Sequence, residues 1–133
     1  MTDKQKIIFA PISEKILQCF FAAYNVLPFG LPADFYSNGL AFEFDEINLK
    51  YQKNLSVPVN YKGNTVGHIK ADFVVDDKIV VRVISCENID KKILDDAKLL
   101  LRLSDFEVCL VLNFGFEDGE YKRIIFTNDF KKK

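Results

Sequence analysis

The chain has 133 residues, of which 49% are hydrophobic, and its 18 Lys and Arg against 19 Asp and Glu give a formal net charge of −1. This length and hydrophobicity predict one packed domain and exclude intrinsic disorder. The charge balance excludes a global positive field that would attract nucleic acid, and it leaves only a local basic patch open. We therefore expect a single domain over residues 1–133, with loose ends at about 1–8 and 128–133.

The N-terminal sequence and the cysteines indicate the cellular compartment in which the protein is expected. The N-terminal sequence MTDKQKIIFAP lacks the apolar core of a signal peptide. No uninterrupted apolar run approaches the ~18 residues that a membrane span needs. The cysteines Cys19, Cys86 and Cys109 lie in apolar runs without a C-x-x-C pair, which is typical of reduced, buried thiols. We expect a soluble, cytoplasmic protein with no membrane association.

Two helices are predicted in the N-terminal part of the chain. The first begins near Ser13, whose hydroxyl suits an N-cap, and ends at Pro28. The second begins near Ala33 and closes at Asn48. In both helices the apolar residues recur at spacings of three and four. The expected buried stripes are Ile16, Phe20, Ala23 and Leu27 in the first helix, and Tyr36, Leu40, Phe44 and Ile47 in the second.

Strands predominate among the elements predicted in the rest of the chain. The predicted elements are strands over Lys50–Asn60, Thr65–Val75 and Lys78–Cys86, a helix capped at Asp90 with a buried face that reaches Leu101, and strands over Val108–Leu112 and Tyr121–Thr127. Pro58 places the first strand at a sheet edge, because proline cannot donate to a ladder. A turn at Asp76-Asp77 joins the next two strands into an antiparallel hairpin, and the continuous apolar run Ile79-Val80-Val81 is typical of a central strand.

A hairpin followed by a strand–helix–strand crossover predicts the fold class. The crossover joins parallel strands, whereas the hairpin joins antiparallel ones, so the sheet is mixed. We predict an α/β fold with a mixed central β-sheet flanked by helices.

Short segments along most of the chain, from about residue 12 to 126, carry a family resemblance. They are Ser13–Ile16, Gly30–Tyr36, Leu40–Glu43, Tyr61–Gly63, Gly67–Phe73, Leu112–Gly115 and Lys122–Ile124. In this order they resemble the small bacterial proteins named after a GxxExxY motif, which belong to the PD-(D/E)XK nuclease-like superfamily. The resemblance implies a restriction-endonuclease-like core.

The resemblance also implies a chemistry, metal-assisted phosphodiester hydrolysis. In that superfamily, carboxylates at the ends of two neighbouring strands hold Mg²⁺, and a lysine two residues after the second carboxylate helps to position the attacking water. A glutamate from a nearby helix often completes the metal shell. The family also carries a polar residue, often glutamine, on the following helix; that position falls at Asp96 or Lys98 here and does not match.

Residue by residue, only one of the expected groups is present. Asp72 matches the first acid. Where the family has E-x-K on the next strand, this chain has Arg82 and Ile84. Gly30 and Tyr36 match the GxxExxY motif, but its glutamate position is Ala33. The retained acid and the three substituted positions form what we expect to be a vestigial pocket, made of Ala33, Asp72, Arg82 and Ile84.

The leading hypothesis is a nuclease-fold protein that has lost catalysis and acts as a binding or interaction module. Arg82 is expected across from Asp72, within reach of a salt bridge, where its permanent charge competes with a divalent cation. No cofactor is then expected. The partner is an unknown protein or a second copy of the chain, and it would dock on an exposed apolar patch or an unpaired sheet edge.

A metal-dependent nuclease with a rearranged site is the first alternative. Asp72 would remain central, and further Mg²⁺ ligands would come from acids such as Asp34, Glu43 or Glu87. His68, the only histidine of the chain, shares a strand face with Asp72 and is a minor candidate for a general base or ligand. This alternative requires at least two acids that converge on Asp72.

Nucleic-acid binding without cleavage is the second alternative. Lys70, Arg82 and Lys122 are the candidate contacts, in a basic stripe that also includes Lys50 and Lys53. The net charge does not support this alternative, so it depends on whether these side chains share one surface.

Overall fold

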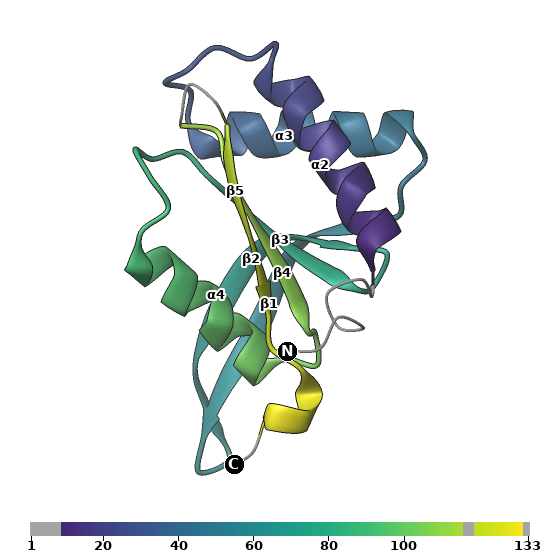
Figure 1. Cartoon of the computed structure of the whole chain (residues 1–133). Coiled ribbons are helices and arrows are strands. Elements are labelled where there is room, and N and C mark those ends of the chain that lie inside the picture. Colours follow the sequence, from purple (N-terminus) through teal and green to yellow (C-terminus); the bar gives the residue numbers. More distant parts are fainter. Residues whose placement is uncertain (1–8, 116–118, 132–133) are drawn as a thin grey trace.

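The computed structural model describes residues 9–115 and 119–131, and a five-stranded sheet forms its centre (Figure 1). In chain order the elements are α2 (Ala10–Tyr24), α3 (Ala33–Glu46), β1 (Tyr51–Tyr61), β2 (Asn64–Val75), β3 (Ile79–Ile84), α4 (Lys91–Leu103), β4 (Val108–Asn113), β5 (Glu120–Ile125) and the 3₁₀ helix η1 (Asn128–Phe130). The strand order is β1-β2-β3-β4-β5. β3 and β4 are parallel and the other neighbours are antiparallel. The predicted mixed α/β fold is confirmed.

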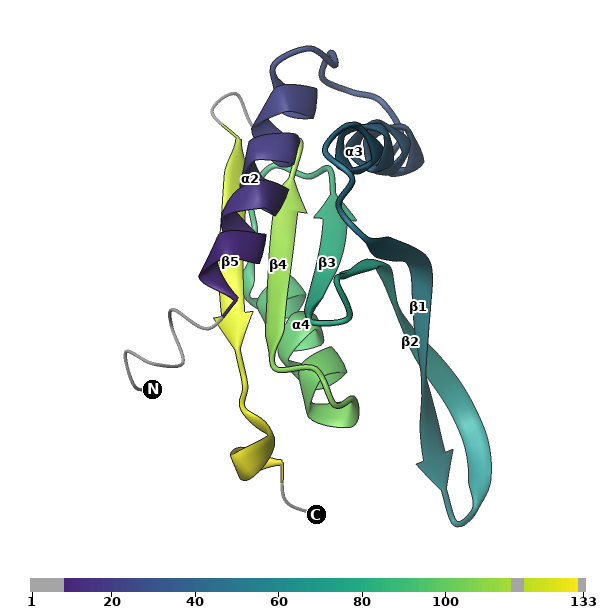
Figure 2. The same ribbon diagram turned by 90° about the vertical axis from the view of Figure 1, so that its right-hand side faces the viewer.

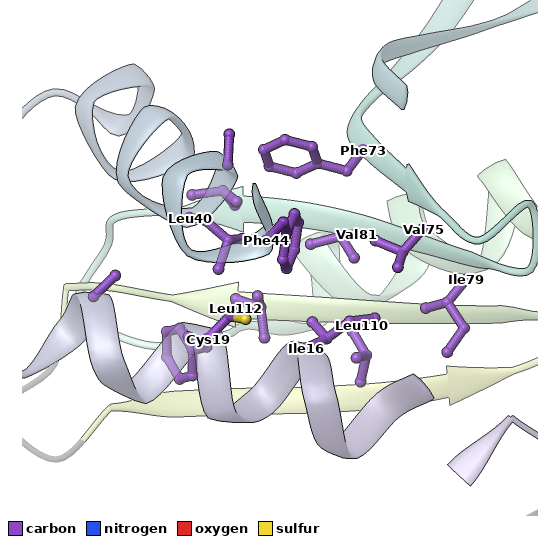
Figure 3. Packing of buried hydrophobic residues seen from close by; sticks show 14 of the residues in the cluster. Ile16, Cys19, Leu40, Phe44, Phe73, Val75, Ile79, Val81, Leu110 and Leu112 are labelled. Atoms are coloured by element: carbon purple, nitrogen blue, oxygen red, sulfur yellow. The ribbon is translucent and has the colours of Figure 1, made fainter. Parts of the chain in front are cut away.

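The helices cover the two faces of the sheet unequally. α2 and α3 pack on one face and α4 on the other (Figures 1 and 2). In the larger core, Ile16 and Cys19 of α2 lie against Leu110 and Leu112 of β4 (Figure 3). The smaller core, between the sheet and α4, includes Ala71, Val80, Ala97, Leu100, Leu101, Cys109 and Val111. β3 and β4 are buried on both sides, as their continuous apolar runs predict.

The boundaries of α2 differ from the prediction at both ends. The helix begins at Ala10, because Pro11 is compatible with the first turn, where its missing N–H has no intrahelical acceptor. Ser13 is therefore buried within the helix and is not its N-cap. The helix ends at Tyr24, before Pro28, and Ala23 O then accepts from both Val26 N–H and Leu27 N–H.

The turns predicted at Asn48 and at Asp76-Asp77 are confirmed, whereas the predicted burial of Ile47 and Cys86 is not. Asn48 follows α3 with a left-handed φ of 57°, and Asp76 and Asp77 adopt φ of 53° and 55° in the turn between β2 and β3. Ile47 was expected in the buried stripe of α3, but it is 46% exposed because it lies beyond the last helical turn. Cys86 is only half-buried, unlike the other two cysteines, and all of them are free thiols.

The C-terminal segment is held in place through one lysine. Lys131 donates from its ammonium to the carbonyl oxygens of Ser104, at 2.9 Å, and Phe106, at 2.6 Å. The expected loose end therefore does not apply to residues 128–131, while residues 1–8 and 132–133 lie outside the described part. None of the helices in the described part is long and apolar enough to span a membrane.

A buried asparagine closes the end of the sheet where β3 and β4 finish. Asn113 Oδ1 accepts from Cys86 N–H at 3.1 Å and from Gly115 N–H at 2.8 Å, and Nδ2 donates to Cys86 O at 3.0 Å and to Glu120 Oε1 at 3.3 Å. Glu120 Oε1 also accepts from Ile89 N–H. A Cβ at Gly115 would collide with the Cys86 carbonyl, so only glycine permits this close approach. All four hydrogen-bonding positions of the amide are used.

We expect Asn113→Ala to lower the free energy of unfolding by about 3 kcal/mol, because it leaves the N–H and C=O of Cys86 without partners in a buried place. Urea denaturation measures this loss. Asn60→Ala is the matched control: Asn60 is exposed and accepts one bond from Thr65, so the change should stay within about 0.5 kcal/mol. Equal effects of the two substitutions would contradict a structural role for the Asn113 network.

Candidate functional site

The site is organised by a fork between β2 and β3. Their ladder pairs Phe73 with Val81, Val74 with Val80 and Val75 with Ile79, and then it stops. Beyond Phe73, β2 continues to pair with β1 alone, and the β1–β2 hairpin diverges from β3 (Figure 2). Asp72 is the residue at the branch point.

The carboxylate of Asp72 fills the opening of this fork. Its Oδ2 accepts from Val83 N–H at 2.6 Å, and its Oδ1 accepts from the Ser37 hydroxyl of α3 at 3.4 Å. In a continued ladder the N–H of Val83 would donate to a carbonyl oxygen of β2. The side chain therefore replaces a missing backbone acceptor and also connects α3 to the sheet.

The electrostatics of Asp72 reflect its half-buried position. Burial raises the pKa of Asp72 above its ordinary value of 3.8, and the hydrogen bond from Val83, the charge of Arg82 and the hydroxyl of Ser37 oppose the rise without cancelling it. The folded environment thus favours the protonated carboxyl relative to water.

Arg82 lies beside Asp72 but does not pair with it. Among the described residues no ion pair within 4.0 Å joins them, so the predicted salt bridge is wrong. The reason is that the carboxylate bonds toward Val83 and α3, whereas Arg82 shares the α4 face of β3 with Val80. Burial raises the pKa of the Cys109 thiol to about 12, while the charge of Arg82 lowers it and that of Asp72 adds to the rise. The Nε of Arg82 is buried without a hydrogen-bond partner in the described part.

The remaining positions of the expected pocket lie around the fork. Ala33 is exposed in the first turn of α3, one helical turn before Ser37 and on the same side of the helix. Ile84 is half-buried against the core on the α4 face. The structure thus brings Asp72 and Arg82 together, and it brings α3 to the fork through Ser37, a contact that the sequence analysis did not identify.

The acids proposed as replacement ligands do not gather at Asp72. Asp34 and Glu87 are exposed, on α3 and in the loop after β3, respectively. Burial raises the pKa of Cys19 on α2, and the charge of Glu43 adds to this rise. Within residues 9–115 and 119–131, no three His, Cys, Asp or Glu side chains form a possible metal site. Mg²⁺ prefers several oxygen ligands, and one occupied carboxylate beside a guanidinium does not fit it.

The proposed basic stripe is also divided. Lys50 pairs with Asp77 at 3.1 Å, and Lys53 donates to Asn38 at 3.2 Å. Lys122 on β5 is two strands away from Arg82, with Val111 of β4 between them in the same register. Lys70 and Arg82 do come together, in a groove of about 400 Å³ between β2 and α4.

Two residues of the GxxExxY-like segment have structural roles. Gly30 adopts a φ of 89°, which favours glycine, in the turn before α3. Tyr36 donates its hydroxyl to Pro28 O at 2.5 Å and accepts from Leu31 N–H at 3.2 Å, and its ring stacks on Phe114 with centroids 4.6 Å apart. These residues hold the turn against α3, so their presence does not depend on catalysis.

A mixed sheet with helices on both faces and an acid at the fork of two strands defines a restriction-endonuclease-like α/β protein. A family model described as PD-(D/E)XK nuclease superfamily matches residues 10–124. The chain belongs to this superfamily. No curated protein and no solved structure matches it.

The raised pKa of Asp72 predicts a particular dependence of stability on pH. The folded state binds the proton more tightly than the unfolded state, so the free energy of unfolding falls as pH rises from 3.8 through the folded pKa, and it stays lower above. Asp72→Asn cannot titrate, so wild type should lose stability relative to this variant over that window. Urea denaturation of both proteins across the acidic range measures the difference.

Asp95→Asn is a control of opposite sign. Lys91 lowers the pKa of Asp95, so wild type should gain stability relative to Asp95→Asn as pH rises toward neutrality. A wild-type gain relative to Asp72→Asn would contradict the assigned environment of Asp72.

Proposed function

We propose that the chain is a degenerate relative of the GxxExxY proteins that binds a partner and does not cleave nucleic acid. One observation supports this most strongly: both oxygens of Asp72 accept hydrogen bonds from the chain itself, and its charged neighbour is the guanidinium of Arg82. The acid that would hold a metal serves the fold, and a cation takes the place of the second ligand.

The three substitutions remove different parts of the expected chemistry. Arg82 supplies positive charge where Mg²⁺ needs a carboxylate. Ile84 has no group to position water, and Ala33 provides no ligand from α3. Loss of one general acid or base commonly costs about 10²–10⁴ in rate, so the combined loss leaves no useful hydrolysis.

A protein partner is the interaction that the described surfaces support best. Phe35 and Phe42 of α3 are 52% and 62% exposed, and their spacing places them on one side of the helix. The β1 edge is less suited to strand addition, because Lys53, the left-handed Asn54 with φ of 63° and Pro58 interrupt it. The free thiols of Cys19 and Cys109 support a reducing, cytoplasmic setting.

Calorimetry with Mg²⁺ and Mn²⁺ tests the loss of the metal site. We expect no saturable heat with wild type, because Asp72 lacks a second carboxylate, and no cleavage of DNA or RNA in the same buffers. Asp72→Asn is the control for binding elsewhere on the surface. Saturable binding that disappears in Asp72→Asn, together with cleavage, would refute the proposal.

Restoring the missing groups tests whether these positions are the former site. The triple variant Ala33→Glu/Arg82→Glu/Ile84→Lys should gain divalent-cation binding, because it returns carboxylates to both sides of Asp72. The same variant with Asp72→Asn should lose this gain, and Ala33→Gln/Arg82→Gln/Ile84→Gln is a neutral control for folding. A folded triple variant that binds no cation would show that the vestigial pocket lies elsewhere.

A further inference from the structure

The groove beside Arg82 is a candidate binding site that differs from the fork itself. Three elements line it, with His68, Ile69 and Lys70 from β2, Arg82 from β3, and Asp96 and Leu99 from α4. Leu55 of β1 and Ile69 of β2 pack against the same core cluster as Ile93 and Leu94 of α4. Its volume of about 400 Å³ is within the range of sites for small molecules.

The charges in the groove are not balanced by the chain. Within the described part, neither Lys70 nor Arg82 forms an ion pair. The one acid that lines the groove, Asp96, has its Oδ2 3.5 Å from the ammonium of Lys92. The other nearby acid, Asp72, bonds toward Val83 and Ser37. Two cations therefore face the groove without a direct partner.

Arg82 is not placed like a side chain whose charge is simply solvated by water. It is half-buried in a central strand, between the buried Val81 and Val83, and its Nε has no hydrogen-bond partner in the described part. A buried donor atom without an acceptor costs free energy, which a bound anion would recover.

We infer that the groove binds a small phosphate monoester through Arg82 and Lys70. The guanidinium presents paired N–H donors that match phosphate oxygens, and the ammonium adds a second charge. A monoester carries about −1.5 to −2 at neutral pH, which matches two cations better than a carboxylate does. Ile69 and the 42% exposed Leu99 provide apolar walls for the organic part of the ligand.

This inference rests on the proposed function and gives it a ligand class. Because no metal site is built at Asp72, the chain's own cations contact the phosphate directly. Binding should therefore proceed in the presence of a metal chelator, and it should weaken as salt rises, because the groove is open to solvent.

Calorimetry in a chelator-containing buffer tests the inference with four probes: adenosine monophosphate, adenosine, inorganic phosphate and a single-stranded oligonucleotide. We expect saturable binding of adenosine monophosphate, weaker binding of inorganic phosphate and no binding of adenosine. Arg82→Met should weaken binding roughly 10- to 100-fold, and Arg82→Lys should weaken it less. Lys70→Met, at an exposed side chain, tests the groove without risk to the fold. Asp96→Asn should tighten binding, because it removes a negative charge.

Lys15→Met is the matched control, because Lys15 is exposed on α2, over the opposite face of the sheet. Equal weakening by Lys15→Met, or no binding of either phosphate by folded wild type, would overturn the inference and leave the proposed function intact. Binding of the oligonucleotide without adenosine monophosphate would overturn it in favour of nucleic acid. A repeat with Mg²⁺ in place of the chelator separates the two proposals: binding that appears only then and is lost in Asp72→Asn would overturn the proposed function as well.

Discussion

The hydrogen bond from Val83 N–H to Asp72 is the contact on which this structure depends. β2 can leave β3 only if the backbone donors of β3 find other acceptors, because an unpaired N–H in a half-buried place is costly. The Asp72 carboxylate, at 2.6 Å, meets that need, and the 3.4 Å contact with Ser37 connects α3 to the same point. The β1–β2 hairpin diverges from β3 beyond this point (Figure 2), and residues of β2, β3 and α4 line a groove beside Arg82. The Asp72 carboxylate thus connects β3 to α3, at the same branch point beside which the groove of Arg82 lies.

In a metal-dependent member of the superfamily, an acid at this fork would hold a cation with help from neighbouring carboxylates. In this chain the neighbouring strand carries the guanidinium of Arg82 instead, and its charge acts on the Asp72 carboxyl. Burial raises the pKa of Asp72, and the charge of Arg82 opposes this rise without cancelling it.

Much of the fold was predictable because local patterns determine it. Apolar runs predicted the buried β3 and β4, Pro58 predicted an edge, and the Asp76-Asp77 turn predicted the hairpin. The start of α2 was missed because Ser13 resembles an N-cap, while the compatible Pro11 gives a weaker signal. The site was less predictable. Cross-strand spacing predicted that Asp72 and Arg82 are neighbours, but not that the β2–β3 ladder stops at Phe73 or that Val83 N–H and Ser37 bond to the Asp72 carboxylate. The contacts of Ser37 with Asp72, and of Asp96 with the groove, depend on tertiary packing and leave no periodic signal in the sequence.

The most direct test of the structural role of Asp72 is an NMR titration with Mg²⁺ that follows the backbone amide signals of Val83 and Ser37. We predict that both signals stay unchanged, because the Asp72 carboxylate keeps its hydrogen bonds within the chain. The amide signals of exposed acids such as Asp95 should shift only weakly and without saturation. A saturable shift confined to Val83 and Ser37 would show that Mg²⁺ displaces these bonds, and it would contradict the proposal that Asp72 serves the fold rather than a metal.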